Sequence, residues 1–302
     1  MSQAAVNSKN VASNPSHDQE EIVRSAIQEI SHVATLPEIT MRIIRLVEDP
    51  DSTAQDLNNV ITNDPALGAR ILKVVNSSFY GLPGQIGSIN RAIVLLELNA
   101  LKNVAIAASL AKIFRGGQIC PSFNARELWK HSIAVASSTR MLASKASLGL
   151  PDEAFLAGLI HDLGIMVEMQ ARRPKLIEVI ETVERDEKVA FRDAETAVLG
   201  ANHEQFGAAL CRAWKFPVCF ANVTGHHHRP QEVPDENRTL AALVHVSDVL
   251  AGRLQLGYSR TVETTEFDPS LLDLLKLTNK TLEEVEAELP KATEEAADLM
   301  QI

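Results

Sequence analysis

A His-Asp dipeptide, His161-Asp162, stands where an apolar stretch of the sequence ends, and it is the clearest sign of chemistry in the chain. His131 precedes the dipeptide by thirty residues, and Asp248 follows it well downstream. Imidazole nitrogens and carboxylate oxygens are the ligands that hold divalent zinc, iron and manganese in proteins. One His-Asp pair is common by chance, but a His, a His-Asp pair and a later Asp, each on or beside an expected helix, predict a metal site.

Two of these residues fall on helix faces that should be buried. Helical spacing places His131 on one face with Leu128 and Val135, and Asp248 stands on a similarly apolar face. An aspartate buried there without a partner would cost on the order of several kcal/mol. Asp248 therefore needs a cation or strong hydrogen-bond donors beside it.

Further candidate ligands are Glu127, four residues before His131, then His203, and the last two members of the triple His226-His227-His228. Each histidine taken alone is explained equally well by a hydrogen bond to a backbone carbonyl, and the triple by a solvated loop. Together, so many imidazoles and carboxylates on different helices would be a costly coincidence in a helical core. Two interpretations stay open: one or two divalent metals (iron, manganese or zinc), or a metal-free, hydrogen-bonded polar cluster. His245, one turn from Asp248, could orient that carboxylate.

Composition favours a helical protein that does not bind nucleic acid. Of the 302 residues, 45% are hydrophobic but only 4% aromatic, and Ala, Leu and Val provide most of the apolar content. A net charge of −10 argues against a phosphate-backbone partner. Three cysteines form no paired framework, which suggests a reducing compartment. With no hydrophobic signal core and no uninterrupted apolar run of about 18 residues, we expect a cytoplasmic protein with no membrane association.

Apolar periodicity predicts an all-α fold in two lobes. We expect a disordered leader over 1–18, a first helical lobe over 19–115, a second over 120–260, and an exposed acidic helical tail over 261–302. Helix starts are indicated by a Ser52–Gln55 capping box, by Asp64-Pro65 and by Ser88. In the second lobe, helices are expected over about 125–146, 174–184, 193–214, 217–224 and 238–254. No alternating strand pattern and no Gly-rich phosphate loop is visible.

From about Ile22 to Leu256 the chain resembles the HDOD family, the HD-related output domains of bacterial signalling proteins. The resemblance rests on these segments: Leu36-Pro37, Asp64 to Leu67, Leu72 to Ser77, Ile89 to Ile93, Gly158 to Gly164, His203 to Ala208, and Trp214 to Pro217. It implies a helical fold of an N-terminal bundle plus an HD-like lobe, and a regulatory role through protein–protein contacts.

The second lobe is similar to the HD superfamily of metal-dependent phosphohydrolases, and this similarity implies roles for the candidate ligands. His131, His161, Asp162 and Asp248 match the four core positions of that superfamily. His203 and His227-His228 stand where the HD-GYP branch, the cyclic-di-GMP phosphodiesterases, adds ligands for a second metal, and Glu127 where some members supply a bridging carboxylate. Two features of that branch are missing: Ile165 stands in place of its lysine, and residues 229–234 replace its Gly-Tyr-Pro loop.

We therefore expect a signal-transduction module that binds signalling proteins, with a structural or sensory metal at the His/Asp cluster. The alternative is a metal-dependent phosphohydrolase or phosphodiesterase that acts on a cyclic dinucleotide or another small phosphoester. In that case Asp162 would be the catalytic centre, as the carboxylate that bridges two ions. Ligands suffice to bind a metal but not to orient a substrate, which is why the signalling interpretation comes first.

Overall fold

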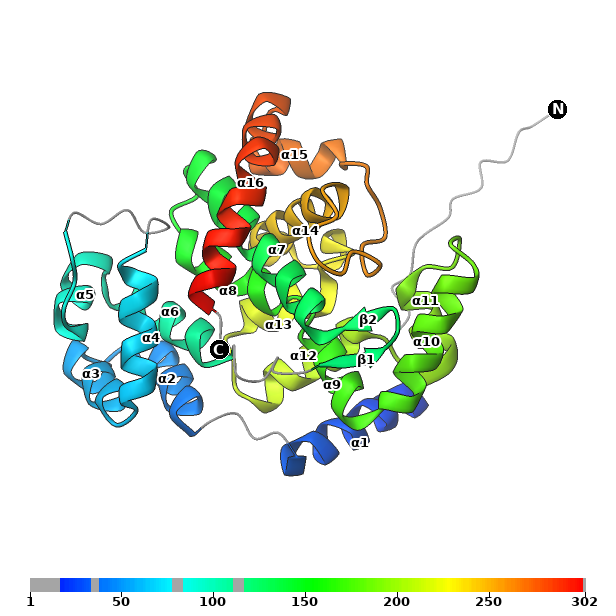
Figure 1. The fold of residues 1–302 in the computed structure, drawn as a ribbon, viewed down its shortest axis with the longest axis horizontal. Coiled ribbons are helices and arrows are strands. Elements are labelled where there is room, and N and C mark those ends of the chain that lie inside the picture. The colour runs from blue at the N-terminus through cyan, green and yellow to red at the C-terminus, as the bar shows by residue number, and fades with distance from the viewer. Residues whose placement is uncertain (1–16, 34–37, 78–83, 111–116, 301–302) are drawn as a thin grey trace.

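The structure, a computed structural model, describes residues 17–33, 38–77, 84–110 and 117–300 (Figure 1). Most of the expected leader lies outside these residues. The described chain is helical apart from one short antiparallel hairpin, which the sequence did not predict, so the all-α fold is confirmed. The hairpin pairs β1 (Gln118–Cys120) with β2 (Phe123–Asn124).

Helices α2 to α6 form a bundle at one side of the molecule (Figure 1). Asp64 and Ser88 cap α4 and α5 as expected, through Leu67 N and Arg91 N. The expected capping box before α3 is shifted by one residue and uses Thr53 and Asp56. The bounds are α2 (Glu38–Glu48), α3 (Ala54–Thr62), α4 (Pro65–Val75), α5 (Ile89–Leu96) and α6 (Leu98–Leu110).

The remaining helices form a larger group that contains all the candidate ligands. The segment expected as one helix over 193–214 is two helices, because Gly200 adopts a left-handed conformation between them. The bounds are α7 (Ala125–Lys145), α8 (Pro151–Ile160), α9 (Leu163–Ala171), α10 (Arg173–Arg185), α11 (Phe191–Leu199), α12 (His203–Ala213), α13 (Val218–His226), α14 (Arg238–Arg253), α15 (Pro269–Leu275) and α16 (Asn279–Met300).

The first helix, α1 (His17–Val33), packs on the larger group rather than within the α2–α6 bundle. Its buried residues Ala26, Ile27 and Ile30 lie against α9 and α12. Arg172, which follows α9, holds α1 in place through an ion pair with Glu29. The expected first lobe, which began at residue 19, is thus divided in space between the two helical groups.

The C-terminal helix α16 is not an exposed tail, contrary to expectation. Leu282, Val285 and Leu289 are buried on one face and pack against α7 and α4. Because α7 belongs to the larger group and α4 to the bundle, α16 joins the two. Several of its acidic residues are exposed, and Glu284 pairs with Lys145 at the end of α7 at 2.9 Å.

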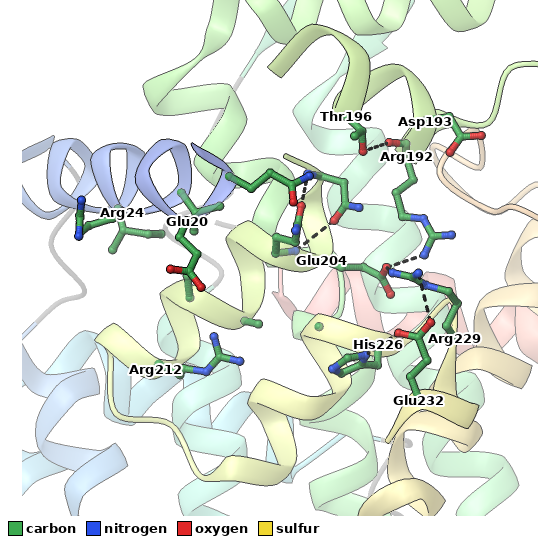
Figure 2. Close-up of a pocket in the computed structure, with 18 of the residues that line it drawn as sticks. Glu20, Arg24, Arg192, Asp193, Thr196, Glu204, Arg212, His226, Arg229 and Glu232 are labelled. Carbon is green, nitrogen blue, oxygen red and sulfur yellow. Dashed lines mark hydrogen bonds and ion pairs between the residues drawn. The ribbon is translucent and has the colours of Figure 1, made fainter. Parts of the chain in front are cut away.

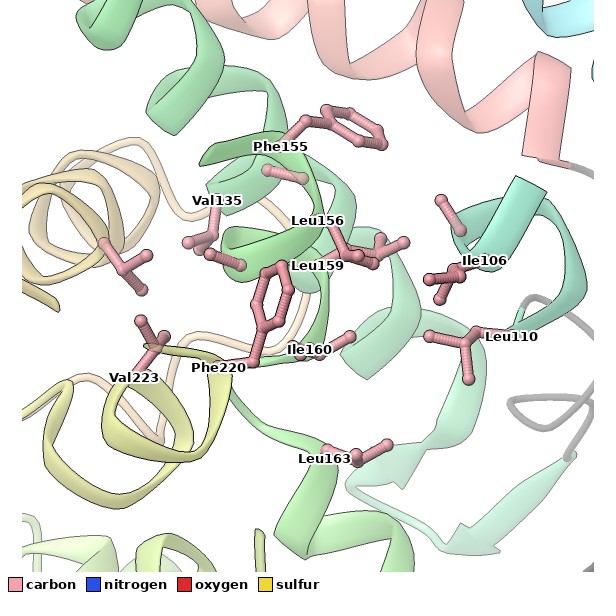
Figure 3. Packing of buried hydrophobic residues seen from close by; sticks show 14 of the residues in the cluster. Ile106, Leu110, Val135, Phe155, Leu156, Leu159, Ile160, Leu163, Phe220 and Val223 are labelled. Atoms are coloured by element: carbon pink, nitrogen blue, oxygen red, sulfur yellow. The ribbon is translucent and has the colours of Figure 1, made fainter. Parts of the chain in front are cut away.

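Helices α8 and α9 form the most apolar part of the core. Residues Pro151–Ala171 are long and apolar enough to cross a membrane, and no other described helix is, but 83% of this stretch is buried inside the protein. Figure 3 shows Leu159, Ile160 and Leu163 packed among side chains of α6 and α13. His161 and Asp162 stand at the junction between α8 and α9, so a rigid apolar frame surrounds them.

Candidate metal centre

The structure brings seven of the eight expected ligands into one buried cluster. They come from five places in the larger helical group: α7, the α8–α9 junction, the start of α12, the end of α13, and α14. Each of the seven is at most 8% exposed. The members are His131, His161, Asp162, His203, His227, His228 and Asp248.

One half of the cluster surrounds His161. Its Nε2 lies 3.3 Å from Asp162 Oδ2 and 3.8 Å from Asp248 Oδ1. His131 Nε2 is 3.0 Å from the same Asp248 oxygen. These four residues are the ones that the sequence pattern singled out first, and here imidazole nitrogens and carboxylate oxygens meet at one point.

Three histidines make up the other half. His203 Nε2 lies 3.3 Å from His227 Nε2 and 3.0 Å from His228 Nε2. Asp162 Oδ1 is 3.5 Å from His227 Nε2 and 3.6 Å from His203 Nε2. Asp162 therefore turns one oxygen to each half of the cluster, which is the arrangement of a bridging carboxylate.

Hydrogen bonds from the Nδ1 atoms fix the histidines with Nε2 inward. His161 Nδ1 donates to the carbonyl of Gly158 at 2.7 Å, and His203 Nδ1 donates to Glu195 at 2.7 Å. A neutral imidazole that donates from one nitrogen presents a lone pair on the other. His131 Nδ1 lies 3.3 Å from the carbonyl of Leu256, so both of its nitrogens face acceptors. A cation between Nε2 and Asp248 would let a neutral His131 satisfy both contacts.

The surroundings of Asp162 show whether a cation would fit in the cluster. Neither of its oxygens has a hydrogen-bond partner among the described residues, and neither has His161 Nε2, although all three atoms are buried. Around a metal held at about 2.1 Å, ligand atoms lie roughly 3.0–3.4 Å apart, close to the separations found here. The donor set and the unpartnered carboxylate both fit divalent metals.

The electrostatics of the two aspartates depend on their histidine neighbours. Burial raises the pKa of Asp162, but His161, His227 and His203 outweigh it and hold that pKa well below its usual range. Burial likewise raises the pKa of Asp248, and the hydrogen bond and charge of His131 bring it below normal. Both carboxylates are therefore ionised at neutral pH. For His228, burial and the neighbouring His227 and His203 hold the pKa well below its usual range.

The structure places two residues, Glu127 and His245, differently from expectation. Glu127 is exposed in the first turn of α7 and takes no part in the buried cluster. His226, the member of the histidine triple that was not an expected ligand, is about one-third exposed and faces Glu232. His245 does not orient Asp248; its Nδ1 donates to the carbonyl of His227 at 2.8 Å and so supports the loop that carries His227.

The buried carboxylates behind the cluster were missed in the sequence. Glu195 accepts from both Nδ1 and the backbone N of His203, at 2.7 and 3.1 Å. Glu168 lies beside it, fully buried, with neither oxygen hydrogen-bonded. Burial first, and then the charge of Glu195, raises the pKa of Glu168 well above normal, and burial raises the pKa of Glu195 in the same direction. Glu168 was a visible signal, as a single acid in the apolar run of α9.

Glu204, also missed, joins the cluster to an arginine. Its Oε2 accepts from Arg192 at 2.6 Å, and its Oε1 accepts from the backbone N of His228 at 3.1 Å. Burial raises the pKa of Glu204, but His227, Arg192 and His203 together bring it below normal. The carboxylate is thus charged, and it holds the end of the histidine triple in place.

Glycines allow the close helix contacts on which this geometry depends. A Cβ on Gly164 would lie 1.8 Å from the carbonyl oxygen of His203, so only glycine lets α9 pass this close to the start of α12. Asn202 then starts α12 with a capping box that includes Gln205. As a result, Asp162 and His203 face each other at the point where α9 and the start of α12 approach most closely.

The comparisons with known proteins agree with this architecture. The structure is similar to that of an HDOD domain protein of unknown function from Geobacter sulfurreducens, with a TM-score of 0.78 and 22% identity over 94% of this chain and 99% of that one. It is also similar to a proposed signal transduction protein from Marinobacter aquaeolei, with a TM-score of 0.74 and 23% identity over 94% and 66% of the two chains. At this level of identity the likeness shows a shared fold.

A third structure, a proposed phosphohydrolase from Shewanella amazonensis, has a TM-score of 0.71 and 20% identity over 91% of this chain and 98% of that one. An uncharacterized protein of Treponema pallidum is 25% identical over 224 residues, which are 74% of this chain and 43% of that protein. The chain thus spans less than half the length of this curated relative. The model of the HDOD domain matches residues 33–230, more than half of the sequence, and the chain belongs to the HDOD family.

Proposed function

We propose that this protein is a regulatory HDOD module that acts through contacts with signalling proteins and holds one or two divalent cations in its His/Asp cluster. The cations would have a structural or sensory role. The observation that carries the metal assignment is Asp162, a buried carboxylate with no hydrogen-bond partner among the described residues and with imidazole nitrogens near both oxygens.

Charge supports the same assignment. Asp162, Asp248 and Glu204 are buried and ionised, and among the described residues only Glu204 has arginine partners, Arg192 at 2.6 Å and the half-exposed Arg229 at 3.5 Å. Burying this much negative charge without compensation is strongly unfavourable. Divalent cations would provide the compensation. His131, His161, Asp162 and Asp248 would hold one of them, and His203, His227, His228 and Asp162 a second.

The burial of the cluster favours a structural or sensory role over catalysis. His228 is 8% exposed and the other members less, so a substrate has no open approach to them in this conformation. Lewis-acid activation of a phosphoester is the chemistry that bound cations would supply. The residues of the cluster would hold and orient such ions, and each of the seven is at most 8% exposed.

A metal-dependent phosphohydrolase remains the second candidate, because the complete ligand set with a bridging Asp162 favours it. Among the similar structures, two from Shewanella amazonensis are described as a proposed phosphohydrolase and a proposed metal-dependent phosphohydrolase. Catalysis would require α12 or the loop after α13 to move and expose the cluster.

One experiment separates these possibilities. The protein is purified without chelators as wild type, Asp162→Ala and the control Asp273→Ala, which removes an exposed acid on α15. We expect one or two metal ions per chain in the wild type and the control, and less than half of that in Asp162→Ala. Metal content that does not depend on Asp162, or no metal in any of the three, would contradict the metal assignment.

The same three proteins are assayed for hydrolysis of bis(4-nitrophenyl) phosphate and of a cyclic dinucleotide. We expect no turnover that depends on Asp162. A rate that is present in the wild type and the control and lost in Asp162→Ala would establish the second candidate instead. Affinity purification of the full chain from cell extract, with mass spectrometry of the proteins that remain bound, tests the proposed signalling partners.

A further inference from the structure

A second site lies on the other side of α12 and the end of α13. These segments carry His203, His227 and His228 of the cluster, and we call them the wall. It is a cavity of about 820 Å³ between α1, α11, α12, α13 and the loop that follows α13 (Figure 2). Small-molecule sites in proteins usually have volumes of about 300–1,000 Å³. None of the seven cluster residues lines this cavity.

Neighbouring residues in the sequence face opposite sides of this wall. His203 belongs to the cluster, while Glu204 lines the cavity. His227 and His228 belong to the cluster, while His226 lines the cavity. The cavity and the cluster are therefore separated by little more than the backbone of α12 and the end of α13.

Arginines supply the positive charge of the cavity. Arg24, Arg192, Arg212 and Arg229 line it, although the chain as a whole carries a net charge of −10. Arg192 is held tightly by Glu204 at 2.6 Å and by Glu263 at 2.9 Å. Arg229 makes only longer contacts, 3.2 Å to Glu232 and 3.5 Å to Glu204. Within the described part of the chain, Arg24 and Arg212 form no ion pair and are exposed.

Carboxylates and apolar side chains complete the lining. Glu20, Asp193 and Glu232 stand around the cavity, and Val23, Ile27 and Ala208 provide apolar surface. In Figure 2, Glu20, Arg212 and His226 extend into the same space from three different helices. Arginines favour a phosphoryl or carboxylate group, whereas carboxylates accept hydrogen bonds from hydroxyl groups. A ligand that satisfies both must carry an anionic group and hydroxyl donors.

We propose that this cavity binds a small hydroxylated organic anion, such as a sugar phosphate or a sugar acid, with Arg212 and Arg229 holding its anionic group. Both guanidinium groups are accessible, and neither is committed to a short ion pair. The carboxylates on α1 and after α13 would select for hydroxyl groups on the rest of the ligand.

Glu204 connects this cavity to the cluster. Its Oε1 lies 4.0 Å from His227 Nδ1, a buried atom with no hydrogen-bond partner in the described residues. An anion that draws Arg229 toward itself removes one contact of Glu204 Oε2, while Arg192 and the backbone N of His228 keep theirs, and this lets Oε1 shift toward His227 Nδ1. That bond would fix His227 with its Nε2 lone pair inward. Ligand binding should then strengthen metal binding, a consequence that rests on the proposed function of the cluster.

Binding is tested by calorimetry on the full chain with ribose 5-phosphate and gluconate, and with neutral ribose as the reference compound. The variants are Arg212→Gln, Arg229→Gln and the control Arg185→Gln, an exposed arginine on α10 outside the cavity. We expect at least one of the two anions to bind and ribose not to bind. Each cavity variant should weaken that binding about tenfold or more, and the control should not. Which anion binds distinguishes a phosphoryl from a carboxylate ligand.

The site is overturned if neither anion binds at millimolar concentration, or if both cavity variants bind as tightly as the wild type. These outcomes do not depend on whether the cluster holds metal. The coupling is tested separately by titrating Mn²⁺ with and without the bound anion. We expect the anion to raise Mn²⁺ affinity about fivefold or more in the wild type and not in Arg212→Gln. An unchanged affinity in the wild type overturns the coupling, and absence of Mn²⁺ binding in both conditions contradicts the proposed function of the cluster.

Discussion

At the scale of single residues, Glu195 determines which nitrogen of His203 faces the cluster. Its carboxylate accepts from His203 Nδ1 and from the backbone N of the same residue, and it is fully buried. A carboxylate behind a metal-binding histidine fixes its tautomer and makes it a stronger ligand. His161 has only a backbone carbonyl in the same position. The two halves of the cluster therefore differ in basicity, and the half with His203 depends on a single side chain.

Replacing Glu195 with Gln should lower the affinity of the His203 half for a divalent metal by about 10- to 100-fold. Burial raises the pKa of Glu195 well above normal, and the amide keeps the shape of this group but cannot take up the negative charge that a cation on His203 would favour. Titration of the variant with Co²⁺, followed by the visible ligand-field spectrum, measures this loss. Glu283→Gln, at an exposed position of α16, serves as the control. Equal affinities for wild type and Glu195→Gln would show that the carboxylate is only a structural support.

Glu168 should make the protein less stable as the pH rises. Its pKa is raised in the folded state, so between its ordinary pKa and that raised value the folded chain keeps a proton that the unfolded chain has lost. Stability then falls with rising pH, with a slope of at most about 1.4 kcal/mol per pH unit for one proton. Glu168→Gln removes this slope.

We expect Glu168→Gln to unfold at a higher urea concentration than the wild type at pH 7 to 8. The difference should shrink as the pH falls and disappear near pH 4, where the carboxyl is protonated in both states. Urea unfolding followed by circular dichroism over this pH range provides the measurement. A difference that stays constant with pH would mean that the substitution acts through packing and not through the proton.

At the scale of elements, the helices of the second lobe could be predicted largely because their buried faces repeat with helical periodicity. The predicted 238–254 helix, for example, is α14 (Arg238–Arg253). What the pattern could not give is the partner of each buried face. The apolar residues of α1 and of α16 recur with helical spacing, which indicates that one face of each helix is buried. The spacing does not reveal that α9 and α12 cover this face of α1, or that α7 and α4 cover this face of α16. Glu195 was hidden for a similar reason, since an acid in an amphipathic helix looks like a surface residue.

The buried face of α16 leads to a test of its role as a joining element. Leu289→Ala should lower the free energy of unfolding by about 2–5 kcal/mol, because Leu289 is fully buried in the contact of α16 with its neighbours. Glu283→Ala, on the outer face of the same helix, should change it by less than about 0.5 kcal/mol. Chemical denaturation measures both. If both variants have similarly small effects, α16 is an exposed tail, as the acidic composition suggested.

At the scale of the whole molecule, the cluster ties together several helices of the larger group through one set of buried polar side chains. Its residues come from α7, α12, α13, α14 and the α8–α9 junction, and none comes from the α2–α6 bundle. The bundle is attached to the larger group through apolar contacts of α6 with α8 and of α4 with α16. Bound cations would therefore stabilise one part of the molecule directly and leave the other to depend on packing alone.

Removing metal should loosen the larger helical group selectively. A ligand present at 100 times its dissociation constant adds about 2.7 kcal/mol of stability, so treatment with EDTA should lower the melting temperature measurably. In hydrogen–deuterium exchange, we expect faster exchange in α9, α12 and α14 after EDTA and unchanged exchange in α3 and α4. Asp162→Ala should show the fast pattern with or without EDTA, since it lacks the bridging carboxylate. Equal acceleration in both groups would mean that the cluster supports the fold as a whole, and no acceleration in either would favour a metal-free polar cluster.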